Sequence, residues 1–260
     1  MVFLSTKLHS SGARNIANRL NSISGGKVLD ACTGNGEFIG TLMKTFKDYD
    51  SFVGIDTSDK ELEAARKDFK DQPVNFIRMN AEKLEFGEDY FDTVCVANSL
   101  HHLTNVDLVL SEMKRVLKSD GYFIVQEMFC DGEQTEAQRT DVLSHGLCAE
   151  IDSLLAVPHR RTFTKRRIES FVKRLALEKV EVFESSRYVK CLFCDQWEKC
   201  EDPKDRDIVN SALKGIDRDL EKLKDHQAQR RFQERAERIK KKIVRFGSTP
   251  ASTLFFIGRK

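Results

Sequence analysis

Short apolar runs alternate with stretches of helical periodicity between residues 27 and 129, and no other feature of the chain constrains its fold as strongly. Strands that alternate with helices build parallel βαβ units. The chain is therefore predicted to be an α/β protein with a doubly wound, mostly parallel sheet. Runs rich in β-branched and aromatic residues predict its first five strands, over Lys27–Ala31, Ser51–Ile55, Val74–Met79, Phe91–Ala97 and Gly121–Phe129.

The rest of the chain predicts more helices and two more strands. A helix after the fourth strand is expected to stop at Ser119–Gly121, where turn residues gather. The charged stretch 205–244 has amphipathic spacing, which favours a solvated helical pair over a coiled coil because Gly215 interrupts its short heptads. Further helices are predicted over 133–157 and 164–175, and strands over Lys179–Glu184 and Ala251–Gly258.

Composition and charge exclude several classes of protein. Of the 260 residues, 40% are hydrophobic and 32% are charged, which provides for a sizeable core and excludes wholesale disorder. The 43 basic and 41 acidic side chains leave a net charge of +2, which argues against a dedicated DNA-binding domain. No apolar run reaches the roughly 18 residues of a membrane span, and Met1–Leu8 has no signal-peptide pattern, so a cytoplasmic location is expected.

A glycine-bearing turn joins the first strand to the next helix, in the segment Val28–Phe38. Such a turn brings backbone N–H groups close to a ligand and directs a helix N-terminus at an anionic group. Asp56, at the end of the second strand, can accept hydrogen bonds from both hydroxyls of a ribose. A ligand that carries a ribose is therefore the working hypothesis, and the alternative is that the glycines only make a corner.

The glycine spacing and the preceding acid favour S-adenosylmethionine over NAD. A dinucleotide fingerprint needs a glycine three residues after the second one, whereas Gly34 and Gly36 are followed by Gly40, one position late. The carboxylate of Asp30 would repel a pyrophosphate, but it can receive the α-amino group of a methionine moiety. We therefore expect S-adenosylmethionine as the cofactor and S-adenosylhomocysteine as its product.

Five motifs that occur in order resemble the class I methyltransferases, and more narrowly the branch that includes ubiquinone and menaquinone biosynthesis methyltransferases. The resemblance covers about residues 10–130 and, more loosely, the last two strands. It implies a Rossmann-like sheet of seven strands in which the last strand is inserted antiparallel. The motifs are Val28–Phe38, Val53–Asp56, Asn80–Glu82, Phe91–Val94 and Glu112–Gly121.

The sequence departs from this family in two places. Cys32 stands where the glycine motif usually has its first glycine, and residues 188–250 separate the last two strands where a hairpin would suffice. The helical insertions are expected to form a cap. The predicted parts are a cofactor-binding core over 1–130, a helical cap or substrate segment over 131–176, and the final strand pair over 177–260 with a charged helical insertion at 188–250.

The resemblance also implies which residues bind the cofactor. The loop after the first strand would line the methionine and ribose, and Asp56 would hold the ribose with Thr57 beside the adenine. The loop after the third strand would read the adenine edge, and the residues after the fourth strand would close the site. The full predicted set is Asp30, Ala31, Gly34, Asn35, Gly36, Asp56, Thr57, Asn80, Ala81, Glu82, Asn98, Ser99 and Leu100.

His101 and His102, just past the fourth strand, and Glu127, at the end of the fifth, are the catalytic candidates. Methyl transfer is an in-line displacement, so the enzyme needs alignment and, for an O–H or N–H acceptor, a base. Histidine suits that base role near neutral pH. The alternatives are that the histidine pair only hydrogen-bonds the backbone or the cofactor and that Glu127 is a solvated acid.

The seven cysteines predict reduced thiols, because their number is odd and several lie in apolar runs. Cys191, Cys194 and Cys200 form the one cluster. A closed zinc site needs four ligands, whereas this stretch offers three cysteines and no histidine. Loosely packed thiols are therefore favoured and no metal ligand is assigned, although a fourth ligand could come through space from Cys148, His145 or His159.

The leading hypothesis is methyl transfer from S-adenosylmethionine to a small organic acceptor. Basic side chains raise the alternative of an RNA or protein methyltransferase, although a solvated helical face explains them more simply. They gather at His159–Arg161, Lys165–Arg167, Lys173–Arg174, Arg230–Arg231 and Lys240–Lys242. If the helical insertions instead form an apolar lid, they suit a hydrophobic small molecule. A third hypothesis is a cofactor-binding protein without transferase activity, whose insertion forms a partner interface.

Overall fold

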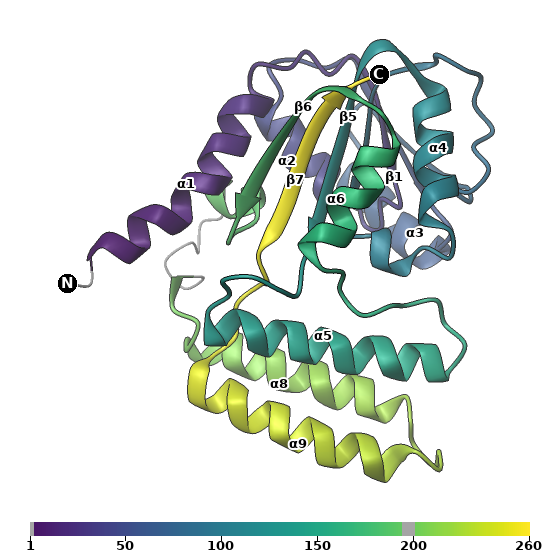
Figure 1. Ribbon diagram of the computed structural model, residues 1–260. Coiled ribbons are helices and arrows are strands. Elements are labelled where there is room, and N and C mark those ends of the chain that lie inside the picture. Colours follow the sequence, from purple (N-terminus) through teal and green to yellow (C-terminus); the bar gives the residue numbers. More distant parts are fainter. Residues whose placement is uncertain (1–2, 194–200) are drawn as a thin grey trace.

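The computed structural model describes residues 3–193 and 201–260, which form one seven-stranded sheet flanked by helices (Figure 1). The strands are β1 (Lys27–Ala31), β2 (Ser51–Asp56), β3 (Val74–Arg78), β4 (Phe91–Ala97), β5 (Leu117–Met128), β6 (Glu178–Ser185) and β7 (Thr253–Arg259). Their order in the sheet is β3-β2-β1-β4-β5-β7-β6. β1 to β5 pair in parallel, and β7 lies antiparallel between β5 and β6. The predicted doubly wound sheet with an antiparallel last strand is confirmed.

Helices cover both faces of this sheet. α1 (Phe3–Leu20), α2 (Glu37–Thr45) and α3 (Asp59–Asp68) pack on one face, where their apolar residues share a buried cluster with alternate strand residues. α4 (Val106–Val116) and α6 (Lys165–Arg174) pack on the other face around a second cluster. None of the helices within the described ranges is both long and apolar enough to cross a membrane.

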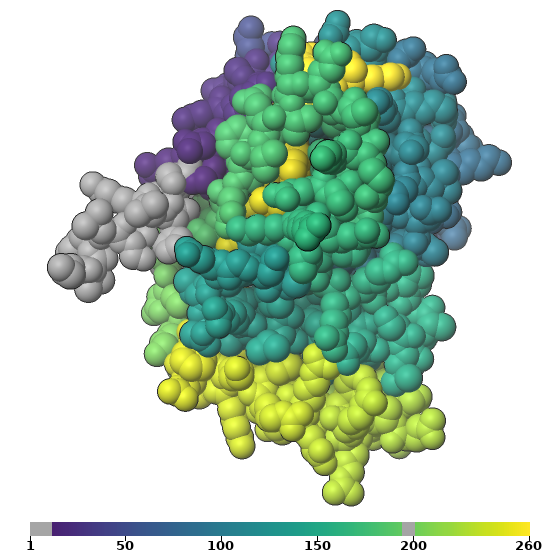
Figure 2. Space-filling model, in the orientation of Figure 1, coloured from purple at the N-terminus to yellow at the C-terminus, as the bar shows by residue number. Residues whose placement is uncertain are grey.

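α5 (Glu136–Leu154), α8 (Arg206–Glu221) and α9 (Gln229–Phe246) form a three-helix layer below the sheet in Figure 1, at the end where β5 leads into α5. Figure 2 shows this layer continuous with the rest of the molecule, with α9 (yellow) on its outer side. The predicted helical pair is thus confirmed, and residues 133–157 contain one helix. The layer has its own core, formed by Leu147, Ile151, Ile216, Leu223, Phe232, Ala236, Ile239 and Ile243.

The boundary between α4 and β5 differs from the prediction. The helix was expected to stop at Ser119–Gly121, but α4 ends at Val116 and β5 begins at Leu117. Leu117 pairs with Phe91, after which the register shifts. The positive φ of +60° at Asp120 belongs to this irregular start. Turn residues therefore mark a bulge inside a strand here, and not the end of the helix.

Candidate active site

The loop after β1 turns sharply at the carboxyl edge of the sheet. Gly34 has a φ of +53° and Gly36 a φ of +81°, which are left-handed conformations that glycine adopts without strain. Gly36 is the N-cap of α2, and the N–H of Gly34 donates to Oδ2 of Asp56 at 2.9 Å. Cys32 itself has a φ of +57°, so the position where the family usually has a glycine keeps a glycine-like backbone.

Two adjoining cavities lie at this edge. The larger cavity has a volume of about 780 Å³ and the smaller cavity about 210 Å³. They meet at four residues that line both, namely Cys32, Gly34, Asn98 and Ser99. The larger cavity extends along the ends of β2 and β3, where it is lined by Asp56, Thr57, Asn80, Ala81 and Glu82. The smaller cavity extends toward α2 and β5, where it is lined by Asp30, Thr33, Glu37, Gln126, Tyr188 and Lys190.

Most of the predicted cofactor residues line one of these cavities, and four do not. Ala31 and Leu100 are fully buried in the core beneath the edge. Asn35 and Gly36 shape the start of α2, where Oδ1 of Asn35 accepts the N–H of Glu37 at 3.3 Å. These four residues therefore support the loops around the site and do not line the cavities.

Asp56 and Asn80 line the larger cavity and also hold their own loops. The two carboxylate oxygens of Asp56 accept the N–H groups of Gly34 and Ser58, each at 2.9 Å. Oδ1 of Asn80 accepts the N–H of Glu82 at 2.9 Å. Each carboxylate oxygen retains a second lone pair, so these turns leave Asp56 able to bind a hydroxyl donor.

Asn98 has two unusual features where the cavities meet. Its backbone is left-handed, with a φ of +47°. Its Oδ1 is buried and has no hydrogen-bond partner within the described part of the chain. A buried carbonyl oxygen without a donor costs about 1–3 kcal/mol. Asn98 is thus an acceptor suited to a donor group on a ligand.

The carboxyl group of Asp30 is almost completely buried at the smaller cavity. Burial raises its pKa to about 7, and the negative charge of Asp56 acts in the same direction. Hydrogen bonds from Thr33 at 2.6 Å and from Cys95 at 3.4 Å oppose this shift. An ammonium group placed beside Asp30 would favour its charged form.

The smaller cavity also contains residues that the motifs did not indicate. Gln126 comes from β5, Tyr188 directly precedes η2 (Val189–Phe193), and Lys190 lies within η2. Nζ of Lys190 binds Oε2 of Glu37 at 2.6 Å, and burial raises the pKa of Tyr188, so its hydroxyl is neutral. The sequence signal that could have found Tyr188 and Lys190 is their position at the start of the unusual insertion.

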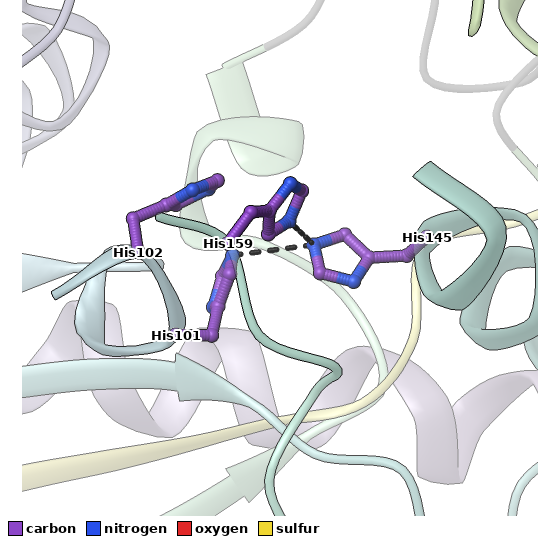
Figure 3. A group of neighbouring side chains, drawn as sticks. All are labelled: His101, His102, His145 and His159. Carbon is purple, nitrogen blue, oxygen red and sulfur yellow. Dashed lines mark hydrogen bonds between the residues drawn. The ribbon is translucent and has the colours of Figure 1, made fainter. Parts of the chain in front are cut away.

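The three catalytic candidates lie together but differ in their access to the cavities. Glu127 is fully buried, and its carboxylate binds the N–H of Leu100 at 2.7 Å and Nδ1 of His101 at 2.8 Å. His101 is also buried, and its Nε2 lies 3.2 Å from Nε2 of His145 (Figure 3). His102 lines the larger cavity. Desolvation by the surrounding protein and the neighbouring histidines lower the pKa of His102, so its ring is neutral at physiological pH.

Of the predicted cysteine cluster, only Cys191 lies within the described residues, since Cys194 and Cys200 fall outside them. Cys32, Cys95, Cys130 and Cys148 are free thiols. Cys148, considered above as a completing ligand, lies on α5 and donates to Oδ1 of Asp219 at 3.3 Å. Burial and nearby carboxylates raise the pKa of Cys148 to about 12, so its thiol is protonated in the metal-free protein.

Many members of the basic runs are paired with acids of neighbouring elements. Arg161 and Arg235 both bind Glu150, and Lys165 binds Glu184 at 2.6 Å. Further pairs join Arg174 to Asp107 and Lys240 to Asp217, each at 2.6 Å. These basic side chains therefore link the outer helices to the rest of the molecule.

The part of the chain that carries the two cavities is similar to known methyltransferases. A family model described as a methyltransferase domain matches residues 29–125, which include the glycine loop and β2 to β4. The ubiquinone/menaquinone biosynthesis C-methyltransferase of Shewanella pealeana is 28% identical over 152 residues, 57% of this chain and 57% of that protein. The chain thus spans little more than half the length of the curated relatives it matches first.

Solved structures share the fold over nearly the whole chain. A candidate methyltransferase from Bacillus halodurans has a TM-score of 0.60 at 17% identity and covers 96% of this chain and 99% of its own. Phosphoethanolamine N-methyltransferase 2 from Haemonchus contortus, bound to phosphomonomethylethanolamine and S-adenosylhomocysteine, has a TM-score of 0.55 at 18% identity. That match covers 95% of this chain and 52% of the other.

Proposed function

We infer, from the premise that this chain belongs to the class I S-adenosylmethionine-dependent methyltransferases, that it transfers a methyl group to a small organic acceptor. The observation that carries this inference is the pair of cavities that meet at Gly34 and Asn98. S-adenosylmethionine supplies a methyl group on a positively charged sulfur, which a nucleophile displaces in line. The residues of the chain have to align the two reactants and exclude water.

In this proposal the two cavities bind the two ends of the cofactor. The larger cavity takes the adenosine, with Asp56 at the ribose hydroxyls and Asn80 at the adenine edge. The smaller cavity takes the methionine end, where the buried carboxylate of Asp30 suits an ammonium group. Asn98 lies between the two, and a donor on the cofactor would satisfy its buried Oδ1.

The acceptor in this proposal is small and polar. The smaller cavity measures about 210 Å³, and its walls present the amide of Gln126, the neutral hydroxyl of Tyr188 and the ammonium of Lys190. The apolar residues of the three-helix layer pack on one another. These features favour an acceptor with hydroxyl, amine or carboxylate groups over a long apolar molecule.

We assign the acceptor to the smaller cavity beside the methionine end, so His102, on the wall of the larger cavity, lies on the adenosine side. His101 and Glu127 lie behind it and act as positioning residues, since both are buried and occupied by hydrogen bonds. The three-helix layer of α5, α8 and α9 forms the cap of the proposed enzyme, whereas α6, which the sequence had assigned to the cap segment 131–176, packs on the sheet as part of the core. A cytoplasmic location is also part of the proposal, and the free thiols named above support it.

The proposal is tested with S-adenosylmethionine that carries a tritiated methyl group. The protein is incubated with this donor and cell extract separated into small molecules, nucleic acid and protein. Wild type should label the small-molecule fraction, and Asp56→Ala should not. Asp59→Asn, an exposed change on α3 outside both cavities, is the matched control. Label confined to nucleic acid or protein would contradict the small acceptor, and no label in any fraction despite cofactor binding would contradict the transferase.

A further inference from the structure

Four histidines from three separate segments meet beside the larger cavity (Figure 3). His101 and His102 follow β4, His145 lies on α5, and His159 lies in the connection to α6. One ring nitrogen of each lies within 4.8 Å of those of the others. Nε2 of His145 is the centre of the group, since it lies 3.2 Å from Nε2 of His101 and 3.2 Å from Nε2 of His159.

Hydrogen bonds alone do not account for these two short contacts. An Nε2 atom carries either one proton or one lone pair in the ring plane, so the central nitrogen of His145 either donates or accepts. If His101 and His159 both present lone pairs, one proton faces two acceptors. If both are protonated, two protons face one lone pair. If only one of them is protonated, His145 can satisfy one contact and not the other. At least one contact therefore lacks its own hydrogen bond in every protonation state.

We propose that the Nε2 atoms of His101, His145 and His159 bind a divalent transition-metal ion such as Zn²⁺, with His102 as the fourth ligand. A metal ion engages converging lone pairs together. A tetrahedral zinc ion with bonds of about 2.0–2.1 Å holds its ligand nitrogens about 3.3 Å apart. The two contacts of 3.2 Å match this spacing. Imidazole ligands suit Zn²⁺ and its transition-metal neighbours, whereas Mg²⁺ and Ca²⁺ prefer oxygen.

The surroundings orient the three central rings for such binding. A metal-bound histidine commonly donates its other ring N–H to a carboxylate or another oxygen, which fixes the tautomer and turns the lone pair toward the ion. Each Nδ1 here has an oxygen partner: Oε1 of Glu127 at 2.8 Å from His101, Oδ2 of Asp152 at 2.8 Å from His159, and Oγ1 of Thr162 at 3.1 Å from His145.

The position of the site indicates what the ion would do. It joins the end of β4 in the core to α5 in the three-helix layer and to the segment before α6. His102 and Pro158 line the larger cavity, so the ion lies beside the proposed cofactor site and goes beyond the proposed methyl transfer. A bound ion would therefore fix the three-helix layer over the carboxyl edge of the sheet.

The test uses the full chain, stripped with a chelator and then titrated with Zn²⁺ in competition with a chromophoric chelator. We expect one equivalent to bind with a dissociation constant below about 1 μM and to raise the unfolding temperature. Co²⁺ in its place should give visible d–d bands of tetrahedral nitrogen coordination without thiolate charge-transfer bands. No bound equivalent in the folded wild type would overturn the proposal.

Zn²⁺ binding by variants shows whether the histidine cluster or the cysteines bind the ion. His145→Ala should weaken Zn²⁺ binding by more than about 100-fold, and Thr162→Val, which keeps the side-chain shape, by about tenfold. His226→Ala is the matched control, because His226 lies between α8 and α9 outside the cluster. A joint Cys191→Ser, Cys194→Ser and Cys200→Ser variant should bind as wild type does. Equal binding by His145→Ala, or loss in the cysteine variant, would contradict the proposed ligands.

Discussion

The buried side-chain oxygen of Asn98 destabilises the free protein, and a bound ligand that donates a hydrogen bond to it would remove this free-energy cost. Asparagine tolerates a left-handed backbone better than most residues, which accounts for its φ of +47°. Its buried Oδ1 lacks a partner among the described residues, so the free protein gains nothing from the amide. The proposed cofactor explains the amide, since the side chain lies where the two cavities meet.

Asn98→Gly tests this explanation, because glycine keeps the left-handed backbone and removes the amide. Removal of the unpaired acceptor is favourable and the backbone freedom of glycine is unfavourable, so we expect the variant to be at least as stable as wild type in urea unfolding. Its affinity for S-adenosylhomocysteine should fall about tenfold, the loss of one hydrogen bond to a buried acceptor. Calorimetric titration measures this, and an unchanged affinity would show that Asn98 does not bind the cofactor.

The pKa of Asp30 predicts how cofactor binding depends on pH. With a pKa raised to about 7, the carboxyl group is mostly protonated at pH 6 and mostly charged at pH 8. Only the charged form attracts the ammonium group of the methionine moiety. Affinity for S-adenosylhomocysteine should therefore rise by about tenfold from pH 6 to pH 8. Asp30→Asn should bind more weakly and with no such rise, whereas an equal rise in the variant would assign it to another group.

At the scale of elements, two glycines in the charged insertion have opposite requirements. Gly215 lies inside α8, where a Cβ would make only an ordinary contact of 3.9 Å with the side chain of Arg218, so Gly215→Ala should stabilise the protein by about 0.5–1 kcal/mol. Gly247 ends α9 with a φ of +81°, and a Cβ there would lie 2.1 Å from the backbone oxygen of Pro203. Gly247→Ala should therefore cost about 2 kcal/mol or more. Urea unfolding of both variants checks the signs, and a stabilising Gly247→Ala would contradict this packing.

Strands with a clear local pattern of β-branched residues could be predicted from the sequence. The β-branched runs predict β1 to β4 to within a residue or two, because central parallel strands are buried on both faces. The start of β5 was missed because Leu117 pairs with Phe91 through an irregular register, which depends on the neighbouring strand. A turn signal at Ser119–Gly121 cannot distinguish a helix end from such a bulge.

At the scale of the whole molecule, several side chains of the basic runs form ion pairs that join different segments of the chain. Arg161, Lys165, Arg174 and Lys240 each bind an acid from another segment. Phosphates would have to compete with these carboxylates. We therefore expect RNA binding weaker than about 10 μM at physiological salt, measured by fluorescence anisotropy with a structured RNA. Saturable binding well below that concentration would favour the RNA methyltransferase alternative.

The candidate site divides into a part that the sequence predicts and a part that only the fold assembles. Asp56 ends β2 and Asn80 lies just after β3, both in recognisable motifs, so their place at the larger cavity could be predicted. Tyr188 reaches the smaller cavity from the insertion, and His145 and His159 meet His101 from segments that are distant in sequence. No spacing rule connects these residues, because tertiary packing brings them together.

Calorimetric titration of the full chain with S-adenosylhomocysteine at pH 8 tests the central claim most directly, because the cavity pair is assigned to that cofactor. We expect saturable binding of one molecule per chain, weakened in Asp56→Ala and unchanged in Asp59→Asn. A sample with the circular dichroism of a folded α/β protein that shows no binding would contradict it.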